Sequence, residues 1–147
     1  LTVATASWAL AGYWASIIGA RIVLSRALLR ASPFRVLSVS AAAACLAAVL
    51  VAVTSSPIWA ALTIAATGFA LAGIYPTLLG IIGAVFPHRS GTVFGLLFTV
   101  ALCGGIFLPW ATGQAAQAAG LRIVFPIVAA AFAAVFLLSR LIARFAR

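Results

Sequence analysis

The chain has 147 residues, of which 67% are hydrophobic and 6% are charged. A soluble domain is about 45–50% apolar and about 25% charged, so this composition excludes a water-soluble globular protein and predicts a membrane-embedded one. The formal net charge of +9 comes from arginine alone, because the chain contains no lysine, aspartate or glutamate.

Five apolar runs follow one another along the chain. A transmembrane helix needs about 20 mostly apolar residues, and a backbone in lipid must satisfy its hydrogen bonds internally. The runs lack the two-residue alternation of barrel strands, so they predict an all-α membrane protein. We expect five transmembrane helices, at residues of about 2–24, 36–54, 58–86, 92–112 and 118–139.

Prolines and glycines mark the expected ends and kinks of these helices. The Ser-Pro pairs at 32–33 and 56–57 are typical of an N-cap followed by proline in the first turn. Pro76, deep in the third run, removes a backbone donor and predicts a kink, and Pro109 predicts a second kink in the fourth run. Gly113 and Gly120 bracket an expected polar connector over residues 114–119.

The arginines predict the topology. They lie at the ends of apolar runs without a basic face between them, so we interpret them as topology markers and expect no nucleic-acid partner. With alternating helices, eight fall on one side and one on the other, and the richer side is the cytoplasm. The chain then starts outside and ends inside, which predicts one further helix before Leu1 and a fragment of a longer chain. The nine are Arg21, Arg26, Arg30, Arg35, Arg89, Arg122, Arg140, Arg144 and Arg147.

Residues that carry enzyme chemistry are scarce. Without a carboxylate there is no general acid–base pair, no Ser-His-Asp triad and no carboxylate metal site. His88 is the one histidine, in an expected cytoplasmic turn, and Cys45 and Cys103 are interpreted as small buried residues. We therefore expect no catalytic residue, no metal, no cofactor and no enzyme activity.

A few polar and aromatic positions are candidates for lining a solute path. Thr67 and Tyr75 fall on one broad face of the third run just before Pro76, Trp14 lies at mid-depth in the first, and Thr99 lies in the fourth. We take Trp14, Thr67, Tyr75 and Thr99 as substrate-lining candidates. Ordinary packing of these side chains remains the alternative.

Arg21 follows Gly19 and lies about one turn or more inside the end of its helix. A charge at the bilayer centre costs about 2.5–3.5 kcal/mol, and less near an end, where the side chain can reach the interface. Arg21 is either a topology marker or part of a cytoplasmic gate or anchor motif with Gly19. No acid in the chain can pair with it, so its partner must be a helix C-terminus, a lipid phosphate or an acid elsewhere.

Small residues recur at helical spacing in the fourth run. Gly91 and Gly95 form a GxxxG pair, and Gly104 and Gly105 follow. In lipid, such residues let helix backbones approach closely. We expect them to pack helices together or to let helices rock against one another.

Three stretches resemble a known family. They are Tyr13-Trp14 with Gly19-Ala20-Arg21, then residues 73–78 in a run ending at Phe86-Pro87, then Gly91 through Gly95 with Gly104-Gly105 and Pro109. Together they resemble the C-terminal half of a major facilitator superfamily (MFS) transporter, helices eight to twelve, and are most similar to the fucose-permease-like branch. The resemblance implies part of a six-helix half bundle that rocks against a second half.

The resemblance also sets the expected function. It implies a permease, part of a secondary active transporter that moves a small polar, sugar-like solute by alternating access across the bacterial inner membrane. Its partners would be the solute, the lipid bilayer and the missing N-terminal half of the same protein. Two alternatives stay open: drug or metabolite efflux within the same superfamily, and a non-transporting membrane scaffold.

Overall fold

The structure is a computed structural model that describes residues 3–28 and 31–145. Thr2, the expected start of the first helix, and Arg30 and Arg147, from the arginine-rich side, lie outside the described residues. Within them the regular structure is helical throughout: α1 (Val3–Leu28), α2 (Pro33–Val53), α3 (Pro57–Leu71), α4 (Ile74–Val85), α5 (Ser90–Ala119), the 3-10 turn η1 (Leu121–Ile123) and α6 (Val124–Phe145).

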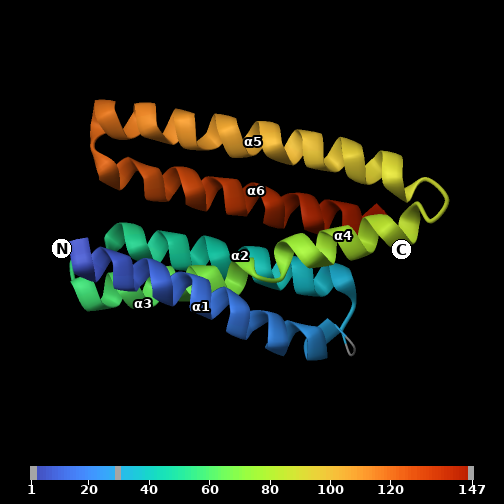
Figure 1. The fold of residues 1–147 in the computed structure, drawn as a ribbon, viewed down its shortest axis with the longest axis horizontal. Coiled ribbons are helices and arrows are strands. Elements are labelled where there is room, and N and C mark those ends of the chain that lie inside the picture. The colour runs from blue at the N-terminus through green and yellow to red at the C-terminus, as the bar shows by residue number, and fades with distance from the viewer. Residues whose placement is uncertain (1–2, 29–30, 146–147) are drawn as a thin grey trace.

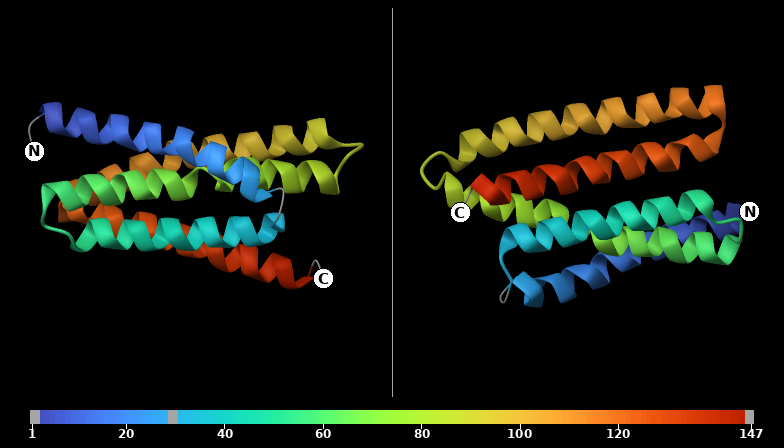
Figure 2. Two further views of the ribbon diagram at one scale, coloured as in Figure 1. Left: turned by 90° about the horizontal axis from the view of Figure 1, so that it is seen from below. Right: turned by 180° about the vertical axis from the view of Figure 1, so that it is seen from behind.

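Five spans in the described residues are long and apolar enough to cross a membrane, when α3 and α4 are taken together as the span Pro57–Val85. This confirms the expected all-α membrane protein, and the chain is an integral membrane protein. The spans alternate in direction (Figures 1 and 2). The junctions α1–α2 and α4–α5 lie at the same end of the bundle as the end of α6, and the junctions α2–α3 and α5–α6 lie at the other.

The described arginines gather at one of these two ends. Arg26 lies in the last turn of α1, Arg89 caps the start of α5, and Arg144 lies in the last turn of α6. Arg122, in η1, lies at the opposite end. The uneven distribution that the sequence predicted is therefore present in space, while the assignment of the richer end to the cytoplasm stays a prediction.

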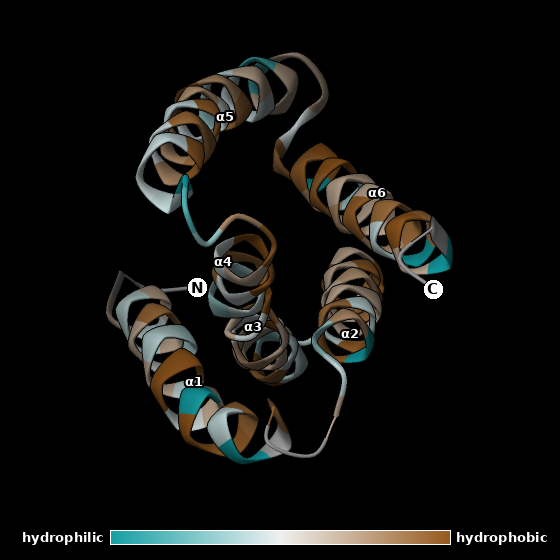
Figure 3. Cartoon of the chain, turned by 90° about the vertical axis from the view of Figure 1, so that its right-hand side faces the viewer, coloured by the Kyte–Doolittle hydropathy of each residue, from teal (hydrophilic) through white to brown (hydrophobic). Residues whose placement is uncertain are grey.

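Helix α2 is the most buried of the five spans and contacts α6, α3 and α4 (Figure 3). Two polar contacts join it to α6: the hydroxyls of Ser38 and Ser139 lie 2.8 Å apart, and the Cys45 thiol donates to the carbonyl of Ala129 at 3.4 Å. Small side chains allow this close packing, because helices in lipid associate by backbone approach. The buried alanines of α2 are Ala41, Ala44, Ala47 and Ala48.

Helices α1 and α5 lie at the margins of the bundle, on either side of α4 (Figure 3). No described residue of α5 is buried, and Cys103 on this helix is exposed rather than buried as expected. Large apolar side chains on both helices are exposed, including Trp8, Ile18 and Leu102. No part of the described chain covers these faces.

Three helix boundaries lie at proline or glycine. Ser32 and Ser56 occupy the N-cap positions of α2 and α3 with proline directly after, as expected, although neither side chain makes a capping hydrogen bond. The expected connector over 114–119 is wrong, because α5 continues through Gly113 to Ala119. The helix ends where Gly120 adopts a φ of +85°, a backbone conformation that favours glycine.

Candidate functional site

The third span is interrupted close to Pro76, where the sequence predicts a kink, and the two residues between its helices, Ala72 and Gly73, keep right-handed helical backbone angles. Helix α3 ends at Leu71 and α4 begins at Ile74, so the discontinuity precedes Pro76. Pro76 lies in the first turn of α4, a position where proline is tolerated. Because Pro76 has no N–H, the Ala72 carbonyl lacks its usual donor four residues on, whereas the Gly73 carbonyl accepts from the Thr77 N–H at 3.2 Å.

Two glycines let neighbouring helices approach this span. A Cβ at Gly68 would lie 2.8 Å from the Tyr13 carbonyl oxygen on α1, and one at Gly73 would lie 2.9 Å from both the Leu24 side chain and the Ser40 hydroxyl. Real Cβ atoms almost never come this close to other atoms. Glycine at 68 and 73 therefore brings α1 and α2 against the interruption.

A cavity of about 380 Å³ lies between α1 and α4 beside the interruption. It unites Arg21, Tyr75 and Pro76, three residues that the sequence singled out on separate grounds. Arg21 is the one charged group among the lining residues that the structure describes, and the other walls are mostly apolar. The full lining is Arg21, Leu24, Ser25, Leu28, Ala72, Tyr75, Pro76 and Leu79.

The polar groups of this cavity differ in whether they already make hydrogen bonds. The Ser25 hydroxyl donates to the Ile22 carbonyl at 2.8 Å, so only its lone pairs face outward. Tyr75 is 48% exposed, and its ring lies 6.4 Å from that of Phe98 on α5, centroid to centroid. Arg21, Tyr75 and mostly apolar side chains therefore line one space.

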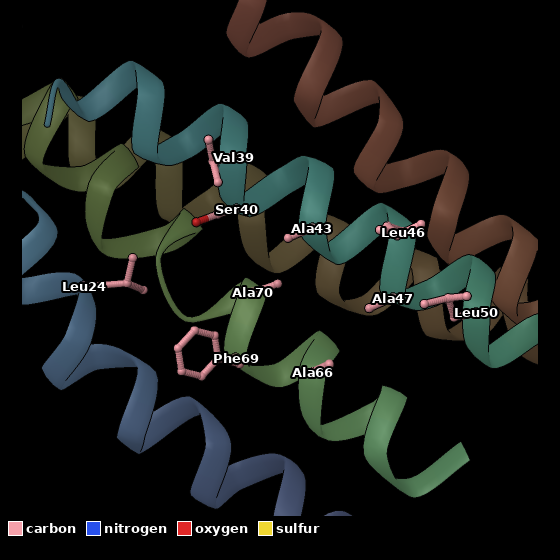
Figure 4. Close-up of a pocket in the computed structure, with 10 residues that line it drawn as sticks. All are labelled: Leu24, Val39, Ser40, Ala43, Leu46, Ala47, Leu50, Ala66, Phe69 and Ala70. Carbon is pink, nitrogen blue, oxygen red and sulfur yellow. The ribbon is translucent and has the colours of Figure 1, made fainter. Parts of the chain in front are cut away.

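A second cavity, of about 460 Å³, lies between α1, α2 and α3 (Figure 4). Leu46 and Leu50 of α2 and Phe69 of α3 contribute its larger apolar side chains, and Leu24 lines both cavities. Ser40 is the one hydroxyl among its described lining residues, and its oxygen points toward the α3–α4 connection. The space is suited to an apolar occupant.

Thr77, one helical turn after Gly73, was not singled out from the sequence. It is only 2% exposed, and its hydroxyl has no hydrogen-bond partner among the described residues. Most buried hydroxyls are hydrogen-bonded, so this group is an exception next to the interruption. A threonine in an apolar run gives no signal of such burial, because it depends on the position of α2.

The other expected lining residues do not join the cavity beside the interruption. Trp14 is exposed on α1 and its ring packs edge-on against Tyr13, with centroids 5.5 Å apart. The hydroxyls of Thr67 and Thr99 donate to carbonyls of their own helices, at 2.8 and 2.9 Å. None of the three is among the lining residues described for that space, so their role stays a prediction.

The glycines expected to pack helices lie elsewhere. Nothing in the described chain comes within 4 Å of a Cβ at Gly19, Gly91, Gly95, Gly104 or Gly105. Their expected helix contacts are therefore absent within the described chain, and contact with further protein stays a prediction. Helix α5 also continues through Pro109 without interruption.

Groups suited to catalysis or metal binding do not come together in the described residues. No three histidine, cysteine or acidic side chains there are placed to hold a metal ion. His88 is exposed between α4 and α5. The expectations of no metal, no cofactor and no catalytic residue stay predictions.

Comparison with known proteins gives one partial match. Over 58 residues the chain is 36% identical to the uncharacterized MFS-type transporter YfkL of Bacillus subtilis (strain 168); this stretch is 40% of the chain and 15% of that protein. No family model and no solved structure matches. The match supports a transporter, of the MFS type at most, and gives no evidence for the fucose-permease-like branch.

Proposed function

We propose that this chain is part of a secondary active transporter that moves a small polar solute by alternating access. The observation that carries the proposal is the cavity that Arg21 and Tyr75 line beside the interrupted span α3–α4. Discontinuous helices in membranes occur where the irregular backbone is buried in protein or lines a cavity, and many transporters place their substrate sites at such points. The partial likeness to an MFS-type transporter supports the same function.

The proposal also includes a cellular location and a partner. We place the chain in the bacterial inner membrane with its arginine-rich end in the cytoplasm, because loop arginines favour that side. The exposed apolar faces of α1 and α5 are suited to pack against a second half of the same transporter, the missing N-terminal half. The chain is not an enzyme in this proposal, because it contains no carboxylate for acid–base chemistry.

A sugar-like solute remains the narrower prediction from the resemblance, with membership of the fucose-permease-like branch. Efflux of a drug or metabolite is the second candidate, and the mostly apolar lining of the cavity between α1, α2 and α3 favours it. In both cases the solute passes between two halves of a bundle. A non-transporting scaffold is the competing function.

The test is solute accumulation by purified full-length protein in liposomes with an imposed proton gradient. The probe is a defined mixture of sugars, organic acids and amines, measured inside the liposomes by mass spectrometry. We expect at least one compound to accumulate saturably with the full-length protein. Residues 1–147 alone should give none, because alternating access needs a second half. No accumulation by the full-length protein would favour the scaffold.

A further inference from the structure

We propose that the cavity between α1 and α4 binds the anionic group of a small organic solute whose remaining part is apolar. The description of the ligand as a solute rests on the proposed transport function. The binding site itself is argued from the residues around Arg21.

The first argument is charge. Arginine stays protonated in proteins, and the whole chain has no aspartate or glutamate to neutralise Arg21. Arg21 lies seven residues before the end of α1 at Leu28, about 10 Å along the helix axis. A cation at that depth is stabilised by an anionic partner. The cavity therefore favours a negatively charged ligand.

The second argument is the hydrogen-bonding chemistry of Arg21 and Tyr75. A guanidinium forms strong, often bidentate hydrogen bonds with carboxylate or phosphate. Within the described residues the Tyr75 hydroxyl makes no hydrogen bond, so it is available to donate to the same anion. Arg21 on α1 and Tyr75 on α4 line the same cavity from different helices.

The third argument is the lining. Leu24, Leu28 and Leu79, with Ala72 and Pro76, form most of the wall. These walls offer a polyol few hydrogen-bond partners, whereas an aromatic or short aliphatic group packs against them without leaving polar groups unpaired. The volume of about 380 Å³ lies within the range of roughly 300–1,000 Å³ typical of small-molecule sites.

The experiment compares acids with their neutral amides. Full-length protein in phosphatidylcholine nanodiscs is titrated with radiolabelled benzoate and hexanoate, and with benzamide and hexanamide. We expect saturable binding of at least one acid and at least tenfold weaker binding of its amide. The Arg21→Gln variant should lose at least tenfold in affinity for the acid, Arg21→Lys should retain part of it, and Tyr75→Phe should bind about fivefold more weakly.

Arg26→Gln is the matched control, because it removes the next arginine of α1, which is not among the described lining residues. It should bind the acid like the unaltered protein, and all variants should melt within a few degrees of it. Arg21→Ala with unchanged melting provides a second loss-of-charge variant if Arg21→Gln fails to fold. Equal binding of acid and amide, or binding that survives loss of Arg21, overturns the inference, as does no saturable binding of either acid.

Two further measurements are needed. The first distinguishes a lipid ligand from a solute, and the second distinguishes binding at this site from transport. Nanodiscs containing phosphatidylglycerol test the lipid source: if the anionic lipid abolishes acid binding, the site belongs to a lipid phosphate and the solute assignment is overturned. Arg21-dependent binding without accumulation in liposomes keeps the site and overturns transport. Accumulation of neutral solutes without acid binding keeps transport and overturns this inference.

Discussion

Three consecutive residues, Tyr75, Pro76 and Thr77, show how sharply the environment changes around one helix. Successive helical residues point about 100° apart, so Tyr75 is half exposed beside Arg21 while Thr77 is buried. Pro76 between them lies in the first turn of α4, where it is tolerated. At the interruption, the role of a residue therefore depends on the direction of its side chain as well as on the type of residue.

Replacing Thr77 with valine should stabilise the protein. The Thr77 hydroxyl is buried without a partner among the described residues, and such a group costs about 1–3 kcal/mol. We expect a higher melting temperature for Thr77→Val in detergent. The control is Thr67→Val, which removes a hydroxyl that donates to the Thr63 carbonyl at 2.8 Å and should give no such gain. A lower melting temperature for Thr77→Val would mean that the hydroxyl binds water, solute or further protein.

Gly68→Ala should destabilise the contact between α1 and α3. The added Cβ would lie 2.8 Å from the Tyr13 carbonyl oxygen, and backbone cannot move aside as a side chain can. Overpacking of this kind costs about 1–3 kcal/mol. Thermal melting should show the loss, while Gly80→Ala, with open space around its Cβ, should be neutral or stabilising. Equal melting of the two variants would contradict this packing.

At the scale of elements, proline acts differently in two spans of similar length. Helix α5 continues through Pro109 for 30 residues, whereas the third span separates into α3 and α4 just before Pro76. The two spans differ in their neighbours. Leu24 and Ser40 lie so close to Gly73 that a Cβ there would be 2.9 Å from each, while α5 buries none of its described residues. Packing against α1 and α2 thus accompanies the interruption.

Pro76→Ala should restore a donor for the Ala72 carbonyl and favour a continuous helix across the interruption. We expect slower amide hydrogen exchange over residues 72–75 and slower solute accumulation by the full-length protein. Pro109→Ala serves as the control, because it changes a helix that is already continuous. If both variants leave exchange at 72–75 unchanged, Pro76 does not maintain the interruption.

At the scale of the whole molecule, the described chain is an open bundle around α2. Most of its described arginines lie toward one end, and its marginal helices α1 and α5 expose most of their apolar side chains. The same openness leaves Arg21 accessible from the space beside α4. Orientation in the membrane is the property that this arrangement most directly predicts.

Single cysteines introduced at Ser56, Gln117 and His88 test that orientation, in full-length protein lacking Cys45 and Cys103. Ser56 and Gln117 lie toward one end of the bundle and His88 at the other. An impermeant maleimide added to intact cells should label Ser56→Cys and Gln117→Cys but label His88→Cys only after the membrane is opened. Labelling of His88→Cys in intact cells would invert the topology, and labelling of only one of the other two would refute it.

The sequence alone determined the class of protein, the five spans and the proline-marked starts of α2 and α3. These properties depend on composition, on run length and on local backbone chemistry, which need no knowledge of neighbours. It also identified Arg21, Tyr75 and Pro76, each for a local reason: a charge in an apolar run, a hydroxyl at depth and a missing N–H. The same local reasoning placed a connector at 114–119, where α5 is helical. A glycine such as Gly113 does not by itself show whether a helix ends there.

Only the tertiary structure decided which of these residues meet. Arg21 and Tyr75 share a cavity because Gly68 and Gly73 allow α1 to approach the interrupted span, while Gly91 and Gly95, with the stronger sequence motif, face open space. It likewise paired Ser38 with Ser139 and buried Thr77. The physical reason is that helix contacts in lipid depend on the mutual fit of two surfaces, and a single apolar run does not specify the surface that it will meet.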